Sequence, residues 1–227
     1  MLERPIELIY DPFALPTAQH RAGLAGLLVL VESLRRRKIK RIPEIHINQD
    51  QTISVRITED SLTGLFNDLY DATMGETESG TKRKDKHKRF VPPLREEKKL
   101  DSKSGKQKTI YIYPQVIPKG RFLSTFGLQE VWLKLWRDAI WGTLRGVPKT
   151  RLPFEQRAKK EVPSETVATW KLLQRFREER EKNTIYTLSI ASSVFVGAQA
   201  ENAERVPFRG RADEVFLLNF WPVVMGV

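Results

Sequence analysis

Residues 15–41 read LPTAQHRAGLAGLLVLVESLRRRKIKR, and this stretch decides the architecture of its surroundings. Thr17 is a suitable N-cap, and the apolar residues after it recur at helical spacing, so the sequence predicts a helix that reaches Arg37. Its apolar stripe consists of Leu24, Leu27, Val31 and Leu34, widened by Leu28, Val29 and Leu30. A helix that is apolar nearly all round is usually buried. Its apolar centre, residues 22–31, is shorter than the roughly 20 residues that cross a membrane.

Two glycines interrupt this helix. Gly23 and Gly26 each cost about 1 kcal/mol relative to alanine in a helix interior. Close approach of another backbone would offset that cost, because glycine has no side chain to hold a neighbour away. The pair therefore predicts a tightly packed segment against this face of the helix.

The end of the same stretch is a run of basic residues. Its six cations are Arg35, Arg36, Arg37, Lys38, Lys40 and Arg41. The negative end of the helix dipole favours cations at a helix C-terminus, but two or three of them would satisfy it. The excess leaves two interpretations open, a solvated helix end and a surface that binds an anion.

Composition narrows the class of protein. The 227 residues carry a formal net charge of +11 and include no cysteine, and the isoelectric point is about 9.9. A globular chain this basic most often binds nucleic acid, and less often an anionic membrane surface. The lack of cysteine excludes disulfides and thiolate nucleophiles and fits a reducing cytoplasm. The first residues contain Glu3 and Glu7 and lack the apolar core of a signal peptide, so we expect a cytoplasmic protein without a membrane segment.

The sequence predicts an α+β fold of mixed helices and short antiparallel strands. Residues 6–10 fit a short strand. Residues 44–48 and 52–58 alternate apolar and polar side chains on either side of a turn at 49–51, which predicts a hairpin. Residues 109–113 are a further strand, closed by a proline.

Three more helices are expected. The first is capped by Thr58 and stopped by Gly75, the second covers residues 128–144, and the third follows a Ser164 cap and ends near Lys182. The second carries a stripe of Trp132, Leu135, Trp136 and Ile140, which is more typical of a core than of a base-stacking platform. The segment 145–163 between the last two is expected to be a connection.

The last part of the chain is ambiguous. Residues 185–206 fit a strand followed by a helix, and residues 215–227, VFLLNFWPVVMGV, are strongly apolar. A domain seldom ends on such a run. We therefore expect either a central strand at this end or a longer polypeptide of which this chain is the front part.

The character of the sequence changes at residues 76–108. This stretch has almost no apolar content and no period, and it carries twelve Lys or Arg against six Asp or Glu. We expect a long, mobile basic loop inserted into the fold. A solvated loop without function remains one interpretation, and so many cations in one place favour contact with phosphates. The candidate binding residues are Lys82, Arg83, Lys84, Lys86, Lys88 and Arg89.

Few residues are arranged for catalysis. His20, His46 and His87 have no partner at the spacing of a metal pair, and no glycine-rich phosphate loop occurs. We expect no catalytic residue, no metal and no cofactor. Glu96 and Glu97 come nearest to a nuclease motif, and they keep a metal-dependent nuclease as the alternative function.

Asn48 and Gln49 lie at the tip of the predicted hairpin, next in sequence to the basic run. Amide side chains at such a position can read base edges, but turns also use Asn and Gln for their own hydrogen bonds. Both roles stay open for this pair.

Four strings resemble one known family. LPTAQHRAGLAGLL at 15–28, RLPFEQRA at 151–158, VFVGAQAENAERVPF at 194–208 and LLNFWP at 217–222 are similar to the large subunit of type I CRISPR Cascade complexes, in the Myxan subtype of the eighth Cas family. Full-length members of the family are much longer. The resemblance therefore implies that residues 1–227 are the N-terminal portion of a large subunit.

The resemblance implies a non-catalytic DNA-recognition subunit of a surveillance complex. In this family the N-terminal part lies near the 5′ handle of the guide RNA, reads the protospacer-adjacent motif in double-stranded DNA and helps to start the R-loop, while guide pairing supplies sequence specificity. The implied partners are guide RNA, target DNA, the backbone and handle-binding subunits and the C-terminal part of the large subunit. Relatives serve in antiviral defence and in CRISPR-associated transposons with transposition proteins, and the sequence does not choose between these settings.

No motif-reading residue is carried over by position, so the candidate residues rest on charge. The first hypothesis is a Cascade subunit that binds target DNA through residues 76–108 and 35–41. The second is a nuclease that uses Glu96 or Glu97. The third is an RNA-binding assembly protein that touches only the guide.

Overall fold

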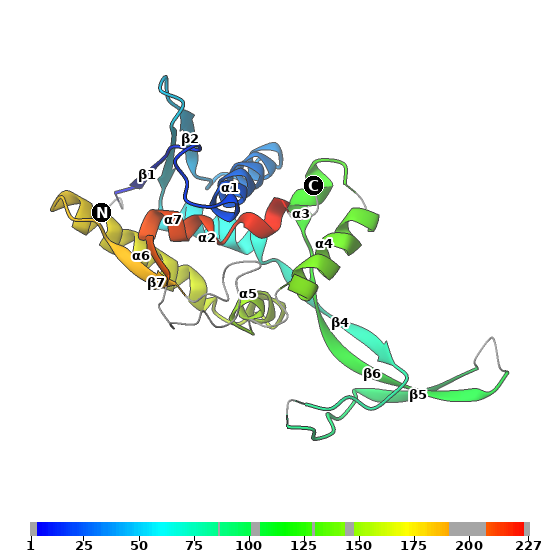
Figure 1. The fold of residues 1–227 in the computed structure, drawn as a ribbon. Helices are drawn as coiled ribbons and strands as arrows, with labels where there is room; N and C mark the ends of the chain where they lie inside the picture. The colour runs from blue at the N-terminus through cyan, green and yellow to red at the C-terminus, as the bar shows by residue number, and fades with distance from the viewer. Residues whose placement is uncertain are drawn as a thin grey trace.

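The computed structural model describes residues 4–85, 87–100, 105–128, 130–143, 148–190 and 208–224 (Figure 1). The helices are α1 (Ala18–Arg36), α2 (Glu59–Leu69), α3 (Arg121–Thr125), α4 (Glu130–Thr143), α5 (Pro148–Ala158), α6 (Ser164–Glu181), α7 (Ala212–Leu217) and the 3₁₀ helix η2 (Trp221–Val224). The strands are β1 (Ile6–Tyr10), β2 (Glu44–Ile47), β3 (Ile53–Ile57), β4 (Ala72–Ser79), β5 (Arg95–Leu100), β6 (Gln107–Pro118), β7 (Thr187–Ile190) and β8 (Phe208–Arg211). Together they confirm the predicted α+β class.

An antiparallel sheet with the order β1-β3-β2 forms one wall of the core. Along β1, buried side chains alternate with exposed ones, as a half-buried strand requires. The buried side chains join one core with the apolar stripes of α1 and α2. The predicted hairpin is confirmed, because β2 and β3 pair in antiparallel register around the expected turn.

Helix α1 begins at the predicted cap, where the Thr17 hydroxyl accepts a hydrogen bond from the His20 amide. The expected close backbone lies against its two glycines. A Cβ at Gly23 would lie 2.2 Å from the Leu217 carbonyl oxygen, and one at Gly26 would lie 2.1 Å from the Phe220 carbonyl oxygen. These carbonyls belong to α7 and the turn before η2, so the C-terminal apolar run packs on α1.

Residues 212–224 are therefore a helix and a 3₁₀ turn, and the expected central strand is wrong for them. The run is apolar because it fills the space beside the glycines of α1, where Phe220 and Val223 are fully buried. The predicted strand before it exists as β7, which pairs with β8. The helix predicted to follow that strand falls on residues 191–207, outside the described part of the chain.

The tryptophan stripe of α4 is only half buried. Trp136 is fully buried against Phe122, and its indole N–H donates to the Pro222 carbonyl at 2.7 Å. Trp132 and Leu135, expected in the core, are 47% and 51% exposed. Their side chains lie beside the buried side of α4, and no described element covers them.

The expected connection at 145–163 is mostly helix. Pro148 is the first residue of α5, a position where a missing backbone N–H costs nothing. Phe154 then anchors α5 in the core, edge-on to the Tyr70 ring. The predicted cap of α6 shifts by one residue, since Pro163 takes the N-cap and Ser164 is the first helical residue.

Helix α2 has the predicted Thr58 cap, as a capping box with Ser61, but it ends at Leu69 instead of Gly75. Gly75 lies within β4, which pairs along its length with β6. β6 in turn continues through Pro114, where the strand was expected to stop. β4, β6 and β5 form a second antiparallel sheet in that order, which Figure 1 shows extending away from the helical body.

This sheet corrects the expectation of an irregular loop over 76–108. Residues 76–79 and 95–100 are strands, and an isolated bridge between Lys84 and Phe90 organises part of the segment between them. Strands form without an apolar side because β6 supplies backbone partners to both neighbours. The mobility predicted for this stretch stays a prediction.

In the described part of the chain, no helix is long and apolar enough to cross a membrane.

Candidate nucleic-acid interface

The candidate interface is the arm formed by β4, β5 and β6 (Figure 1). Residues directly opposite each other in an antiparallel pair share a face of the sheet. The register places Glu78 of β4 and Arg95 of β5 opposite Ile112 of β6, and Ser79 and Glu96 opposite Tyr111. The arm therefore has two faces with different side chains.

We call the first the paired face. Its charged residues are Glu76, Glu78, Arg95, Glu97, Lys99 and Lys108. The two terminal nitrogens of Arg95 each donate to the Glu76 carboxylate at 2.6 Å, and Arg95 Nε donates to Glu97 at 2.8 Å. Lys99 pairs with Glu78. Hydrogen bonds from Arg95 hold the pKa of the Glu76 carboxyl below its usual value.

We call the second the cationic face, and the segment 80–94 lies on it. The Arg83 amide donates to the Tyr113 hydroxyl at 2.9 Å, and the Arg83 guanidinium lies 4.9 Å from the centroid of that ring. The Lys82 ammonium lies 5.3 Å from the centroid of the Tyr111 ring. Tyr113 is 1% exposed as a result, so the segment is held against the sheet by named contacts.

The tip of that segment is a turn organised by one carboxylate. Asp85 Oδ1 accepts from the amides of His87 and Arg89 at 2.8 and 2.9 Å, and Oδ2 accepts from Arg89 Nε at 2.9 Å. The Asp85 amide donates back to the Arg89 carbonyl at 2.8 Å. These bonds lower the pKa of the Asp85 carboxyl, the amide of Arg89 foremost. Arg89 is therefore committed to the turn.

The same turn presents other cations outward. The Lys84 ammonium lies 4.9 Å from the centroid of the exposed Phe90 ring. Lys88 adopts a left-handed backbone with φ of 61°, which reverses the chain at the tip. Lys86, also a predicted binding residue, lies outside the described residues.

The two faces differ in charge. The paired face carries three cations and three carboxylates. The cationic face, with the segment on it, carries Lys82, Arg83, Lys84, Lys88, Arg89 and Lys98 against Asp85 and Glu96, a net of +4 in the described residues. Among those residues, no carboxylate lies within 4.0 Å of the charged groups of Arg83, Lys84, Lys88 or Lys98. The excess charge of the arm is therefore on one side.

In the basic run at the end of α1, unlike on the cationic face of the arm, most cations are paired with carboxylates. Arg35 and Arg36 both pair with Glu32, one turn earlier on the same helix. Arg37 forms a two-pronged ion pair with Asp68 of α2, at 2.8 and 2.5 Å. The Asp68 side chain is only 7% exposed, so this arginine is a structural residue.

The remainder of the run passes along α2. The Arg41 side chain pairs with Asp60 at 2.9 Å, in an exposed position. Lys38 closes α1 with φ of 58°, and the Ile39 amide donates to the Leu34 carbonyl, as in a Schellman motif. Among the described residues, Lys38 and Lys40 have no carboxylate within ion-pair distance, so they are the two cations of the run that remain open to a ligand.

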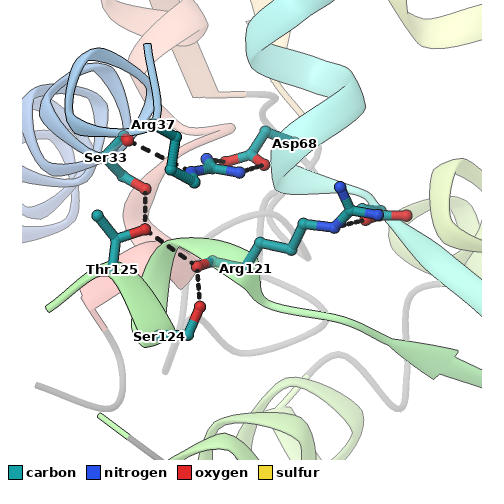
Figure 2. Close-up of polar contacts among 7 residues, drawn as sticks. Ser33, Arg37, Asp68, Arg121, Ser124 and Thr125 are labelled. Carbon is teal, nitrogen blue, oxygen red and sulfur yellow. Dashed lines mark hydrogen bonds and ion pairs between the residues drawn. The ribbon is translucent and has the colours of Figure 1, made fainter. Parts of the chain in front are cut away.

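The end of α1 also fixes the base of the arm, as Figure 2 shows. Arg37 Nε donates to the Ser33 carbonyl at 3.3 Å, and the Ser33 hydroxyl donates to the Thr125 hydroxyl of α3 at 3.0 Å. Arg121 of α3 pairs at 2.6 Å with Asp71, the residue immediately before β4. The end of the basic run is thus connected through α3 to the root of the arm.

At the tip of the β2–β3 hairpin, Asn48 makes hydrogen bonds within the hairpin itself. The Asn48 side-chain amide donates to the hydroxyls of Thr52 and Ser54, both at 2.9 Å. That amide is therefore engaged within the sheet. Gln49 is exposed beside it, and its predicted part in base reading stays a prediction.

The two carboxylates of the nuclease alternative point to opposite faces of β5. Glu96 lies on the cationic face and pairs with Lys82 at 3.4 Å, while Glu97 lies on the paired face and bonds to Arg95. Because their side chains point to opposite faces, Glu96 and Glu97 are not arranged to bind one metal ion together. No group of three or more His, Asp or Glu side chains in the described residues could hold a metal.

Comparison with known families gives the class of the chain. A family model described as the type I-B CRISPR Cas8b N-terminal domain matches residues 42–227. The chain belongs to this family, and it is thereby part of a type I-B CRISPR large subunit, as the predicted resemblance to a Cascade large subunit indicated. Large subunits of this kind are generally non-catalytic components of Cascade, with CRISPR RNA and DNA as partners of the complex. A search of curated proteins finds no match.

Sequence reasoning missed two features of the arm. Lys98 belongs to the cationic face, and Tyr111 and Tyr113 hold the basic segment against the sheet. The alternation of TIYIY was the available signal, because a strand at 109–113 with one tyrosine side must have a partner on that side.

Proposed function

We propose that this chain is a non-catalytic DNA-recognition part of a type I-B Cascade complex, and that the cationic face of its arm binds target double-stranded DNA. In that role it reads the protospacer-adjacent motif and supports R-loop formation, while the guide RNA supplies sequence specificity. Its partners are the guide RNA with its 5′ handle, the backbone and handle-binding subunits and the C-terminal part of the large subunit. Antiviral defence and CRISPR-associated transposition are both compatible settings.

One observation carries this proposal: among the described residues of the three strands and the segment 80–94, the paired face is neutral, while the cationic face and the segment held against it carry a net of +4. Phosphate contacts by Lys and Arg release counterions and supply most of the affinity for DNA. Cations already paired with a carboxylate must first lose that partner, whereas Lys84 and Lys88 have none among the described residues. The uneven charge of the two faces therefore favours contact between the cationic face and the DNA duplex.

The test compares two double variants that remove equal charge from opposite faces. Lys84→Gln with Lys88→Gln alters the cationic face, and Arg95→Gln with Lys99→Gln alters the paired face, where both cations have carboxylate partners. Each variant is assembled into the full Cascade complex, and its affinity for target duplex is measured across a salt series. The logarithmic salt dependence falls by about 0.9 for each phosphate that the protein no longer neutralises.

We expect the cationic-face variant to bind more weakly and its slope to fall by about 2. The paired-face variant should keep both affinity and slope within error. Equal effects from the two variants, or none from either, would contradict the assignment of the cationic face.

Two further measurements separate the other functions. Cleavage of labelled DNA with Mg²⁺ that is abolished by Glu97→Ala would establish the nuclease. Equal affinity of the complex for duplexes with and without the adjacent motif would favour a protein that touches only the guide.

A further inference from the structure

A groove runs between β1 and α6, on the side of the molecule away from β3. One hollow of about 420 Å³ is lined by Arg4, Glu7, Arg56, Arg177, Arg180 and Glu181, with Phe176 at its floor. A second, of about 270 Å³, is lined by Ile9, Ile185, Tyr186 and Arg211 and shares Phe176 and Arg180 with the first. The groove is therefore rich in arginine at one end and mainly apolar at the other, where Arg211 is paired with the buried Asp213.

The wall formed by β1 is an open sheet edge. Its neighbour in the sheet is β3 alone, among the described strands. The Glu7 carbonyl faces away from β3, because Arg180 Nη1 donates to it at 3.1 Å. Backbone groups along an antiparallel strand alternate in direction, so the amide and carbonyl of Ile9 face the groove as well. Such an edge is a template for another extended chain.

The arginines of the groove have donors to spare. Arg177 and Arg180 each place one nitrogen on a backbone carbonyl, of Arg4 at 3.2 Å and of Glu7 at 3.1 Å. A guanidinium has five N–H donors. No carboxylate of the described residues lies within 4.0 Å of either guanidinium, while Arg4 and Arg56 have exposed acidic partners. The pair is open to an anionic group.

The spacing and charge pattern favour a peptide over a nucleic acid. Glu7 and Ile9 mark the two hollows and lie two strand residues apart, about 7 Å, which is the spacing of side chains i and i+2 in an extended peptide. Glu7 and Glu181 lie among the arginines and would repel a continuous row of phosphates. A peptide can place a single carboxylate beside Arg177 and Arg180 and no negative charge beside Glu7 or Glu181.

We propose that this groove binds an extended acidic segment of a partner protein by strand addition to β1. An acidic side chain takes the hollow at Arg177 and Arg180, and an apolar side chain two residues away takes the hollow at Ile9 and Phe176. Peptide backbone groups bond to the edge at Glu7 and Ile9, and Arg180 moves from the Glu7 carbonyl to the carboxylate of the peptide. The site is separate from the arm, so its test fails independently of the DNA-binding proposal.

The test begins with a display library of random twelve-residue peptides selected against the full chain. We expect enriched peptides to carry Asp or Glu two positions from Leu, Ile, Val or Phe. The best peptide is synthesised and its affinity measured for the wild type, for Arg177→Gln with Arg180→Gln, and for Lys171→Gln. The last variant is a control, since Lys171 is exposed on the same helix and makes no ion pair with a described residue.

The double variant should weaken binding at least tenfold, and Lys171→Gln should not change it. Binding should also slow hydrogen exchange of the amides at residues 7–9, which a contact through side chains alone would leave unchanged. If the double variant does not fold, the single variants Arg177→Gln and Arg180→Gln replace it, because each removes one hydrogen bond to a backbone carbonyl. No enrichment, enrichment without the acidic pattern, unchanged exchange at residues 7–9, or binding of the oligonucleotide dT12 in place of peptide would overturn the proposal.

Discussion

Replacing Gly26 by alanine should destabilise the domain, although alanine is the better helix former. The added Cβ would lie 2.1 Å from the Phe220 carbonyl oxygen, 2.9 Å from its carbon and 3.2 Å from the Val223 Cβ. Non-bonded carbon atoms are most stable at about 3.5–4.0 Å, so η2 would have to retreat from α1 by about 1 Å or more. The obstacle is backbone, which no side-chain rotation can move aside.

The magnitude follows from three contributions. Alanine gains about 1 kcal/mol of helix propensity over glycine. Overpacking a core typically costs about 1–3 kcal/mol and sometimes more, and a clash with backbone belongs at the upper end. Any retreat of η2 also uncovers part of Phe220 and Val223, whose full burial is worth about 1.5–3 kcal/mol each. We therefore expect a net loss of about 2–4 kcal/mol.

Urea unfolding followed by tryptophan fluorescence measures this loss, since Trp136 and Trp221 lie in the affected core. Ala25→Gly is the control, because Ala25 is exposed on the same turn and should lose about 1 kcal/mol through propensity alone. If the free energy of unfolding of Gly26→Ala instead rose by about 1 kcal/mol, helix propensity alone would explain both variants, and the close packing of η2 on α1 would be refuted.

Three other predictions concern stability. Lys38→Gly should gain about 1 kcal/mol, because glycine adopts the left-handed conformation at the end of α1 without strain; an unchanged melting temperature would contradict this. Arg37→Ala should lose about 2–4 kcal/mol in urea unfolding, because it leaves the buried Asp68 carboxylate without a partner, whereas Arg36→Ala on an exposed pair should lose less than about 1 kcal/mol; equal losses would contradict this. Burial lowers the pKa of the His20 imidazole, so the unfolded chain binds this proton more readily, and the free energy of unfolding should fall as pH drops below about 6.5; a His20→Gln variant with the same pH dependence would contradict this.

Patterns that depend on the local chain were readable from the sequence. The period of α1 and its Thr17 cap, the hairpin of β2 and β3, and the Thr58 cap of α2 all follow from neighbouring residues. Gly23 and Gly26 also predicted a tertiary contact, because their cost in a helix interior implies a closely packed neighbour. The local sequence did not identify the segment that forms this contact.

β4 and β5 were not readable from the sequence, because most side chains on both of their faces meet water. Periodicity reveals a strand when one face is buried, and β5, with the sequence REEKKL, has charged residues on both faces. β4 in turn pairs with β6, from which it is separated along the chain by residues 80–106. The helix α5 was missed for another reason, since its prolines are typical of a connection although the first of them suits a helix start.

The pairing of cations could not be read from charge counts either. The six basic residues at 35–41 look alike in the sequence, yet Arg37 is bound to an aspartate 31 positions away and Lys38 is not. Tertiary partners decide which positive charges remain for a ligand. A basic run at a helix end acquires such partners from the next helix, whereas an arm that leaves the body meets few carboxylates beyond its own.

A last prediction concerns the root of the arm, which orients the cationic face without belonging to it. The arm buries few side chains of its own, so its direction depends on its root, where Asp71 pairs with Arg121 at 2.6 Å and with Lys119 at 3.5 Å. Asp71→Asn should loosen that root while every side chain of the cationic face is kept. The assembled complex should then bind target duplex more weakly at every salt concentration, while the salt dependence stays that of the wild type. A slope that falls by about 2, as expected for the Lys84 and Lys88 double variant, would mean that the root itself contacts DNA and that the assignment to the cationic face is incomplete.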